Sequence, residues 1–168
     1  MLEELETLNM DTVEFNPELL RMIRPIYHEK FKQMSLEYDH SGSMSFNCRN
    51  MLLTSLEGAP QYVGGYFDCS YNQLTTLKGA PQSVSGTFYC NDNHLTSLEG
   101  APQYVRWGFS CDNNHLTSLE GAPQYVGGYF SCNNNPRLPD EQINHYREFL
   151  KGQHQECLVD GHYMPPKQ

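Results

Sequence analysis

LTSLEGAPQYV, residues 53–63, decides the fold because the chain repeats it almost letter for letter. The stretch returns at 95–105 and 116–126, and it appears as LTTLKGAPQSV at 74–84. The cysteines give the period, because each is 21 residues from the next: Cys48, Cys69, Cys90, Cys111 and Cys132. A constant period without insertions indicates stacked copies of one unit, since a unit this short buries its apolar side only against its neighbours.

Each unit reads V-x-x-x-F-x-C-x-x-N-x-L-T-x-L-x-G-A-P-x-x, and its parts predict different pieces of one coil. The F-x-C step has the period of two that is typical of a very short strand. The Asn three residues after each Cys is predicted to donate its amide hydrogens to turn carbonyls, so that successive copies form a ladder. The proline of G-A-P lacks an N–H and disfavours helix at the preceding Ala, so the back of each coil is predicted to be non-helical.

The pattern F-x-C-x-x-N-x-L-x-x-L resembles the leucine-rich-repeat signature L-x-L-x-x-N-x-L, with Phe and Cys replacing two leucines. The following G-A-P-x-x-V resembles the proline-containing back of short leucine-rich repeats in effector proteins of enteric pathogens. LTSLEGAP itself is similar to repeats in uncharacterised bacteriophage and bacterial proteins. The resemblance covers residues 42–138 and implies a five-coil leucine-rich-repeat solenoid, with short parallel strands on a concave face and a non-helical convex side. Gly42 and Met51 in the first coil depart from the pattern.

Residues 1–41 are expected to form a helical cap on the solenoid 42–138, because an uncovered solenoid end is an open strand edge. Apolar side chains at helical spacing place a helix over 17–36. Asn16 is predicted as its N-cap, with a proline at the first helical position. Pro25 is expected to kink or split this helix.

Residues 139–168 are expected to form a second helical cap followed by an irregular tail. A helix is predicted over 140–151, with Asp140 as its N-cap and Gly152 as its stop signal. Its apolar side is predicted to consist of Ile143, Tyr146, Phe149 and Leu150. Residues 153–168 show no periodic pattern and are predicted to be irregular.

Charge and composition exclude several classes of function. The net charge is −9, and nucleic-acid backbones are bound by clustered Lys and Arg, so no nucleic-acid partner is expected. No apolar stretch approaches the ~18 residues of a membrane span. The first residues, MLEELETLNM, lack the blocks of a signal peptide, so a cytoplasmic protein is expected. The repeated cysteines have apolar neighbours and are predicted to be small buried hydrophobes without disulfides.

Groups that suggest catalysis or metal binding are few. His94 and His115 share one repeat position and are predicted to stack on neighbouring coils as surface residues. His154, Cys157 and His162 could supply three zinc ligands, but their spacing fits no compact zinc finger. Some of the resembling effectors carry a large ubiquitin-ligase domain after the repeats, and the residues after 138 are too few for one. We therefore expect no catalytic residue, no metal and no cofactor.

The outward-pointing strand residues form three columns that make the candidate binding face. The column before the Phe consists of Ser45, Tyr66, Thr87, Gly108 and Tyr129. The column between Phe and Cys consists of Asn47, Asp68, Tyr89, Ser110 and Ser131. The column after the Cys consists of Arg49, Ser70, Asn91, Asp112 and Asn133. Tyrosines suit an interface because they offer large area and a hydroxyl, whereas the alternative is a merely soluble face. A second tyrosine row is predicted to be structural cover on the proline side: Tyr62, Tyr104 and Tyr125.

Coil four breaks the repeat where other coils have Gly-Gly or Ser-Gly, because it has Arg106 and Trp107 there. Trp and Arg are frequent interface anchors, so Trp107 is predicted to be one. The alternative is that Trp107 fills the gap that Gly108 leaves in place of Tyr. The predicted partner-binding residues are Trp107, Arg106, Tyr66, Tyr89, Tyr129, Asp68, Asp112, Asn91 and Arg49.

The sequence therefore favours a non-enzymatic protein–protein interaction module, a small recognition or inhibitor protein that binds a host protein through its concave face. The phage-like repeats suggest a phage protein that blocks a host enzyme such as a defence factor. Two other classes remain open. One is a small-ligand sponge, in which the tyrosines with Asp68 and Asp112 hold a nucleotide base or a sugar. The other is a metal-dependent enzyme built on the C-terminal His and Cys residues. Partner identity and oligomeric state do not follow from the sequence.

Overall fold

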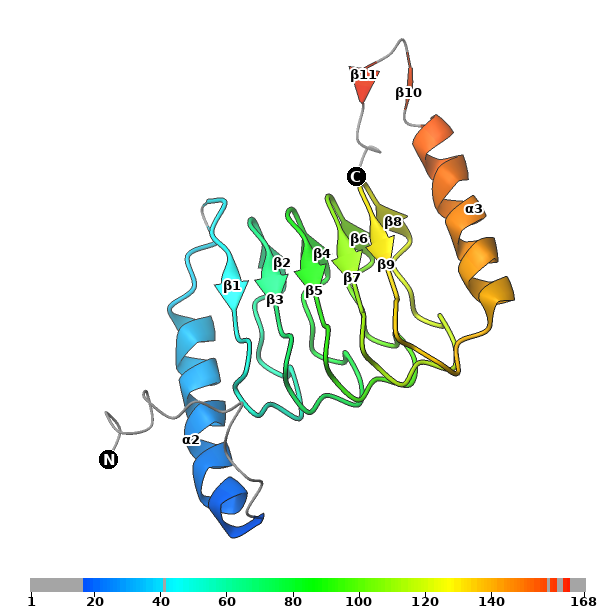
Figure 1. Cartoon of the computed structure of the whole chain (residues 1–168). Helices are drawn as coiled ribbons and strands as arrows, with labels where there is room; N and C mark the ends of the chain where they lie inside the picture. Colours follow the sequence, from blue (N-terminus) through cyan, green and yellow to red (C-terminus); the bar gives the residue numbers. More distant parts are fainter. Residues whose placement is uncertain (1–16, 41, 157, 160–161, 164–168) are drawn as a thin grey trace.

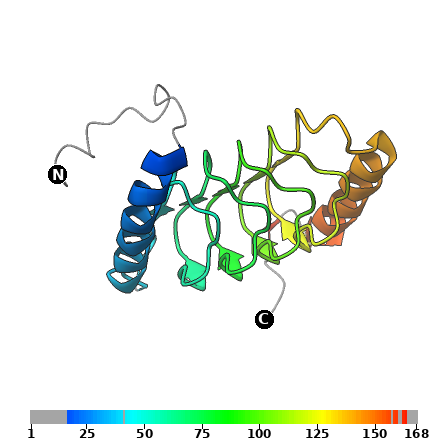
Figure 2. The ribbon, with the colours of Figure 1, turned by 90° about the horizontal axis from the view of Figure 1, so that it is seen from below.

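A computed structural model describes residues 17–40, 42–156, 158–159 and 162–163, with side chains up to residue 152. The repeats form a parallel β-solenoid that lies between two helices, α2 (Pro17–Leu36) and α3 (Asp140–Glu156) (Figure 1). Figure 2 shows the same stack from below, with the coils following one another from α2 to α3. The expected repeat solenoid is therefore confirmed.

The strands of the solenoid are two residues long and form two parallel sheets. Sheet A, in spatial order, consists of β1 (Phe46–Asn47), β3 (Phe67–Asp68), β5 (Phe88–Tyr89), β7 (Phe109–Ser110) and β9 (Phe130–Ser131). Sheet B consists of β2 (Tyr62–Val63), β4 (Ser83–Val84), β6 (Tyr104–Val105) and β8 (Tyr125–Val126). Sheet A contains the expected F-x-C strands, whereas sheet B was not predicted.

The repeat period places identical side chains directly above one another. Phe46 pairs with Phe67 and Phe67 with Phe88, and this register continues to the last coil. Neighbouring Phe rings stack with centroids 5.3–5.6 Å apart. The Phe, Cys, Leu and Val columns fill the interior, where most of their members are inaccessible to solvent. Burial of these apolar columns is the main stabilising term, because one coil alone cannot bury its own.

The predicted asparagine ladder is present in the interior of the turns. The Oδ1 atom of Asn93 accepts a 3.0 Å bond from the N–H of Leu74 in the preceding coil. Its Nδ2 atom donates to the carbonyls of Cys69 and Cys90, at 3.0 and 3.3 Å. Equivalent bonds across neighbouring coils are made by Asn72, Asn114 and Asn135.

Two repeat positions have left-handed backbone. The first lies two residues after each Cys and has φ of 54–56° at Asn50, Tyr71, Asp92, Asn113 and Asn134. Asn and Asp adopt this region more readily than most residues, which accounts for their frequency there. The second is the glycine of G-A-P, for example Gly100 with φ of 88°. A Cβ on Gly100 would lie only 2.6 Å from the carbonyl carbon of Leu77, so the coils could not approach as they do.

The tyrosine row on sheet B is not uniform cover. Tyr62 is 63% exposed, so the prediction that it covers the structure is wrong. Tyr125 is buried, and its ring stacks on that of Tyr104 with centroids 4.7 Å apart. Tyr62 differs because its neighbour on the next strand is the small Ser83, which offers no ring to stack on.

Helix α2 packs its buried Phe31 against the first coil, with the Phe31 ring edge-on to Phe46 at 5.8 Å. Beyond the helix, the Tyr38 hydroxyl donates to the carbonyl of Met44 at 2.6 Å. The helix continues through Pro25, so the expectation of a split is wrong. Pro25 is exposed, and water can bind the helix carbonyl that its missing N–H leaves unpaired.

The N-cap of helix α3 lies one residue earlier than predicted. The carbonyl of Pro139 accepts the N–H groups of Gln142 and Ile143, so Pro139 and not Asp140 is the N-cap. Asp140 instead lies in the first turn, where a carboxylate suits the positive end of the helix dipole. The helix also passes through Gly152, so the predicted stop there is wrong. Gly152 has no positive φ and no close neighbour, so nothing at this glycine ends the helix.

The apolar side of α3 contacts the last coils. Tyr146 packs edge-on against Phe130 with centroids 4.7 Å apart, and its hydroxyl donates to the Pro123 carbonyl at 2.6 Å. Phe149 is 44% exposed and lies largely off this side, contrary to the prediction. After the helix, β10 (Leu158–Val159) pairs antiparallel with β11 (His162–Tyr163), so the tail is not entirely irregular. Among the described residues, no helix is long and apolar enough to cross a membrane.

Candidate functional site

Three tyrosines form a connected aromatic cluster on the outer side of sheet A. Tyr66 and Tyr129 are about half exposed, and Tyr89 lies between them with intermediate burial. The ring of Tyr66 meets that of Tyr89 edge-on, with centroids 6.4 Å apart. Burial, followed by a hydrogen bond with Tyr89, raises the pKa of Tyr129 to about 12. The predicted residues Tyr66, Tyr89 and Tyr129 are therefore brought together, and we call them the tyrosine cluster.

The connection across coil four depends on Gly108. A Cβ on Gly108 would overlap the ring of Tyr129, so the missing side chain provides the space that this ring occupies. Tyr129 thus extends over coil four toward Thr87 and Tyr89 in coil three. Sequence reasoning identified Gly108 as a departure, but it did not identify the tyrosine that fills the gap.

Trp107 is 63% exposed and therefore lies on the surface. The alternative in which Trp107 fills the gap at Gly108 is wrong, because Tyr129 lies there. The backbone of Trp107 keeps the repeat pattern, since its N–H donates to the carbonyl of Gly86 at 3.2 Å. Arg106, also exposed, donates its N–H to Val84 at 2.9 Å. Both side chains are therefore additions to a regular coil.

Asn91 and Asp112 hold neighbouring coils together. The Oδ1 atom of Asn91 accepts the Ser110 hydroxyl at 2.7 Å and the Asp112 N–H at 3.0 Å. The Oδ1 atom of Asp112 accepts the Ser131 hydroxyl and the Asn133 N–H, both at 2.6 Å. Bonds to a carboxylate are strong, so this part of the predicted face has a structural role.

Arg49 and Asp68 lie in the first two coils, and both are engaged locally. The guanidinium of Arg49 sits over the ring of Tyr71, 4.1 Å from its centroid. The Oδ1 atom of Asp68 accepts the Ser70 N–H at 2.9 Å. Ser70 itself is almost completely buried, so the column after the Cys offers less free surface than its polarity suggests.

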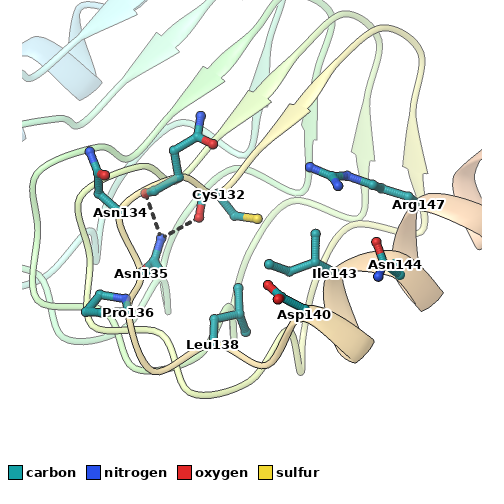
Figure 3. Close-up of a pocket in the computed structure, with 10 residues that line it drawn as sticks. Cys132, Asn134, Asn135, Pro136, Leu138, Asp140, Ile143, Asn144 and Arg147 are labelled. Atoms are coloured by element: carbon teal, nitrogen blue, oxygen red, sulfur yellow. Dashed lines mark hydrogen bonds between the residues drawn. The ribbon is translucent and has the colours of Figure 1, made fainter.

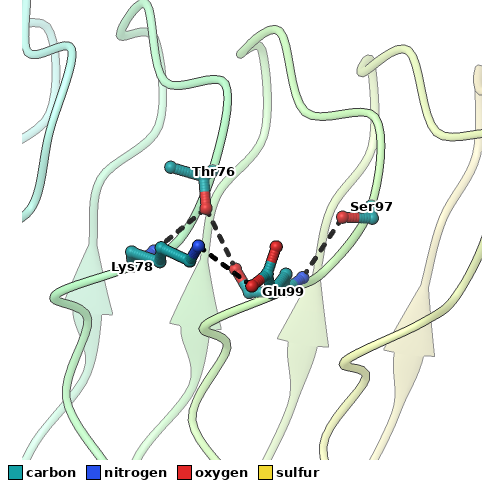
Figure 4. A network of polar contacts seen from close by, with 4 residues as sticks. All are labelled: Thr76, Lys78, Ser97 and Glu99. Carbon is teal, nitrogen blue, oxygen red and sulfur yellow. Dashed lines mark hydrogen bonds and ion pairs between the residues drawn. The ribbon is translucent and has the colours of Figure 1, made fainter.

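The turn before G-A-P carries a row of charged side chains on successive coils. Three of the coils have Glu57, Glu99 and Glu120, and coil two has Lys78. Lys78 forms an ion pair with Glu99 at 3.0 Å, as Figure 4 shows together with the threonine and serine that bond to the turn. Both partners are mostly exposed, so the pair contributes little stability.

The described histidines and cysteines have structural environments. His94 and His115 stack with ring centroids 5.6 Å apart, as predicted. The five repeat cysteines are free and buried. Burial raises the pKa of Cys90 well above its ordinary value, since a thiolate would lose its hydration. Within the described part of the chain, no group of three His, Cys, Asp or Glu residues could hold a metal ion. The side chains of His154, Cys157 and His162 lie outside the described residues.

A cavity of about 660 Å³ lies between the last coil and α3. Figure 3 shows Asp140 and Arg147 on the helix side and Asn134 and Asn135 on the coil side. Burial raises the pKa of Cys132, and the nearby Arg147 partly offsets this. The cavity thus presents amides with one charge of each sign, which favours no single class of ligand.

A second cavity, of about 410 Å³, lies between α2 and the first coil, and sequence reasoning missed it. Its lining consists of Arg21, Arg24, Pro25, His28, Leu52, Leu53 and Thr54. The sequence signal was a pair of departures at one repeat position, Leu52 and Gln73, where coils three and four have histidine.

Comparison of the chain with protein-family models, with curated proteins and with solved structures finds no match.

Proposed function

We propose that the chain is a leucine-rich-repeat module that recognises another protein, with α2 and α3 as its caps. The F-x-C-x-x-N-x-L pattern and its asparagine ladder support the repeat type. The capping role is supported by Phe31 on the first coil and by Tyr146 on the last, because each covers a Phe column that would otherwise end in solvent.

The observation that carries this function is the exposed side chain of Trp107. Trp107 directly precedes Gly108, which occupies the repeat position that Tyr66 and Tyr129 have in other coils. The repeat position of Trp107 holds glycine in the neighbouring coils, so the fold does not require an aromatic residue there. Trp, Tyr and Arg are enriched among the residues that contribute most to the binding energy of interfaces, which supports Trp107 as an anchor. The tyrosine cluster adds further aromatic area in and next to strands of sheet A.

The proposed partner is a host protein, and the proposed role is a non-enzymatic recognition or inhibitor protein that acts in the cytoplasm. The similarity of LTSLEGAP to phage repeats supports a phage protein directed at a host defence enzyme. Small-ligand binding by Asp68 and Asp112 is less favoured, because their carboxylates already accept bonds from neighbouring coils or turns.

The test compares two substitutions that each install a residue found at the same repeat position in another coil. Trp107→Gly removes the proposed anchor and installs the residue found at positions 86 and 128. Tyr62→Ser is the matched control, because Tyr62 is equally exposed but lies on sheet B, where the next coil has Ser83. Immobilised wild type and variants are incubated with bacterial lysate, bound proteins are identified by mass spectrometry, and the affinity for the recovered partner is measured.

We expect wild type and Tyr62→Ser to retain the same protein, and Trp107→Gly to bind it at least about 30-fold more weakly, as loss of a hot spot of ~2 kcal/mol predicts. Retention of the partner by folded Trp107→Gly, or its loss from Tyr62→Ser, would contradict the proposed face. Failure of wild type to retain any specific protein would contradict the proposed function.

A further inference from the structure

Departures from the repeat in the first two coils meet at one place against α2. At the position where later coils have His94 and His115, coil one has Leu52 and coil two has Gln73. The Oε1 atom of Gln73 accepts a 2.6 Å hydrogen bond from Nη2 of Arg24 on α2. A histidine copy at this position would not supply the same amide oxygen, so the substitution is coupled to the orientation of Arg24.

The nitrogen Nε of Arg24 is the second feature of this place. It is buried and has no hydrogen-bond partner among the described residues. A buried donor on a charged group is costly when it is unpaired, and guanidinium N–H groups match the oxygens of carboxylates and phosphates. Gln73 holds Nη2 in place, while no acceptor of the described chain reaches the Nε donor of the same guanidinium.

Leu52 supplies a third, independent observation. Its φ is +54°, a conformation that is unfavourable for a bulky residue without a polar side chain. Gln73 and the later histidines, at the same repeat position, do not appear among the residues with positive φ in the described chain. Such backbone outliers persist only where the surrounding structure imposes them, and they are frequent at ligand sites.

Arg24 and Leu52 both line the cavity of about 410 Å³ between α2 and the first coil, and Gln73 is bonded to this lining through Arg24. Arg21 and His28 add two more side chains with nitrogen donors to Arg24, and the described lining includes no Asp or Glu. Leu52 and Leu53 provide an apolar wall. The cavity at the other end of the solenoid differs in this respect, because Asp140 there accompanies Arg147.

We propose that this cavity binds an oxyanion, a phosphate or carboxylate group, on a small molecule with an apolar body. Arg24 and Arg21 hold the oxyanion by charge-assisted hydrogen bonds, and the leucines contact the apolar body. The position of Arg24 depends on Gln73. This site is separate from the proposed protein-binding surface, since Trp107 lies in coil four, and either can fail without the other.

The test is isothermal titration calorimetry of the full chain at constant ionic strength, with inorganic phosphate and, separately, benzoate as probes. Three variants are compared with wild type: Arg21→Gln, Arg24→Lys and the control Arg137→Gln. Arg24→Lys retains the charge but removes Nε. Arg137→Gln makes the same charge change as Arg21→Gln at an exposed residue outside both cavities. Circular dichroism verifies that each variant is folded.

We expect wild type and Arg137→Gln to bind at least one probe equally well. Arg21→Gln and Arg24→Lys should bind it about tenfold to a hundredfold more weakly, which corresponds to loss of one hydrogen bond to a charged group. Preference for phosphate over benzoate would identify a phosphate ligand, and the reverse a carboxylate ligand. Equal weak binding by all four proteins would overturn the proposal, as would wild type that binds neither probe.

Discussion

Replacement of Asn93 by alanine tests whether the asparagine ladder holds the coils together. The side chain is almost completely buried in the central coil. Its removal leaves the N–H of Leu74 in the preceding coil without the acceptor it has at 3.0 Å, whereas the carbonyl of Cys69 loses one of two bonds and keeps the one from Asn72 at 2.9 Å. An unpaired buried group costs about 1–3 kcal/mol, so we expect Asn93→Ala to lower the free energy of unfolding by about 1–3 kcal/mol.

The assay is equilibrium unfolding in urea, followed by circular dichroism, with Asn144→Ala as the control. Asn144 is exposed on α3, so the same Asn-to-Ala substitution there should alter the free energy of unfolding by less than about 0.5 kcal/mol. A loss for Asn93→Ala as small as that of the control would refute the reasoning. It would mean that water or a backbone shift satisfies the N–H of Leu74, and that apolar stacking alone sets the spacing of the coils.

Two further predictions concern glycines and cysteines. Gly100→Ala should lower the free energy of unfolding by about 2 kcal/mol or more, because φ is 88° there and the new Cβ would overlap the backbone of Lys78. Gly152→Ala in α3 should instead raise the free energy of unfolding by about 0.5–1 kcal/mol, and urea unfolding measures both changes. Burial raises the pKa of Cys90 in the folded chain, so near and above the ordinary thiol pKa of 9.0 the unfolded state loses its proton first, and the free energy of unfolding falls as pH rises. Alkylation at pH 8, followed by mass spectrometry, should modify Cys132, the less buried thiol, before Cys90. Equal losses for the two glycine variants, or stability that rises from pH 8 to 10, would contradict these predictions.

The repeat core was predictable because each of its rules is local and occurs several times. The position of Asn93 three residues after Cys90 already indicated bonds to the turn, and those bonds are present. The exact ends of the elements were less predictable, because one copy carries no repetition. Pro139 caps α3 in place of Asp140, and the helix passes Gly152, since backbone geometry and packing outweigh these weak local preferences.

The candidate binding face was predictable as a set of columns, but its chemistry was not. Asp112 and Asn91 share their columns with exposed residues, yet their oxygens bond to the neighbouring coil. Whether a polar side chain faces water or the next coil depends on the residue 21 positions away. Tyr129 reaches over Gly108 for the same reason, because the identity of one residue in a column sets the space available to the next.

The sequence by itself determined that the chain stacks in coils of 21 residues, with its Phe, Cys and Asn columns inside, because one period aligns like with like along the whole array. Only the tertiary structure decided which of the outward residues remain free. It exposed Trp107, used Asp112 between coils, and brought Arg24 from α2 against Gln73, which is 49 residues away. These outcomes depend on contacts between coils and helices that no local pattern encodes, since the energy of a polar or aromatic side chain depends on what lies above and below it.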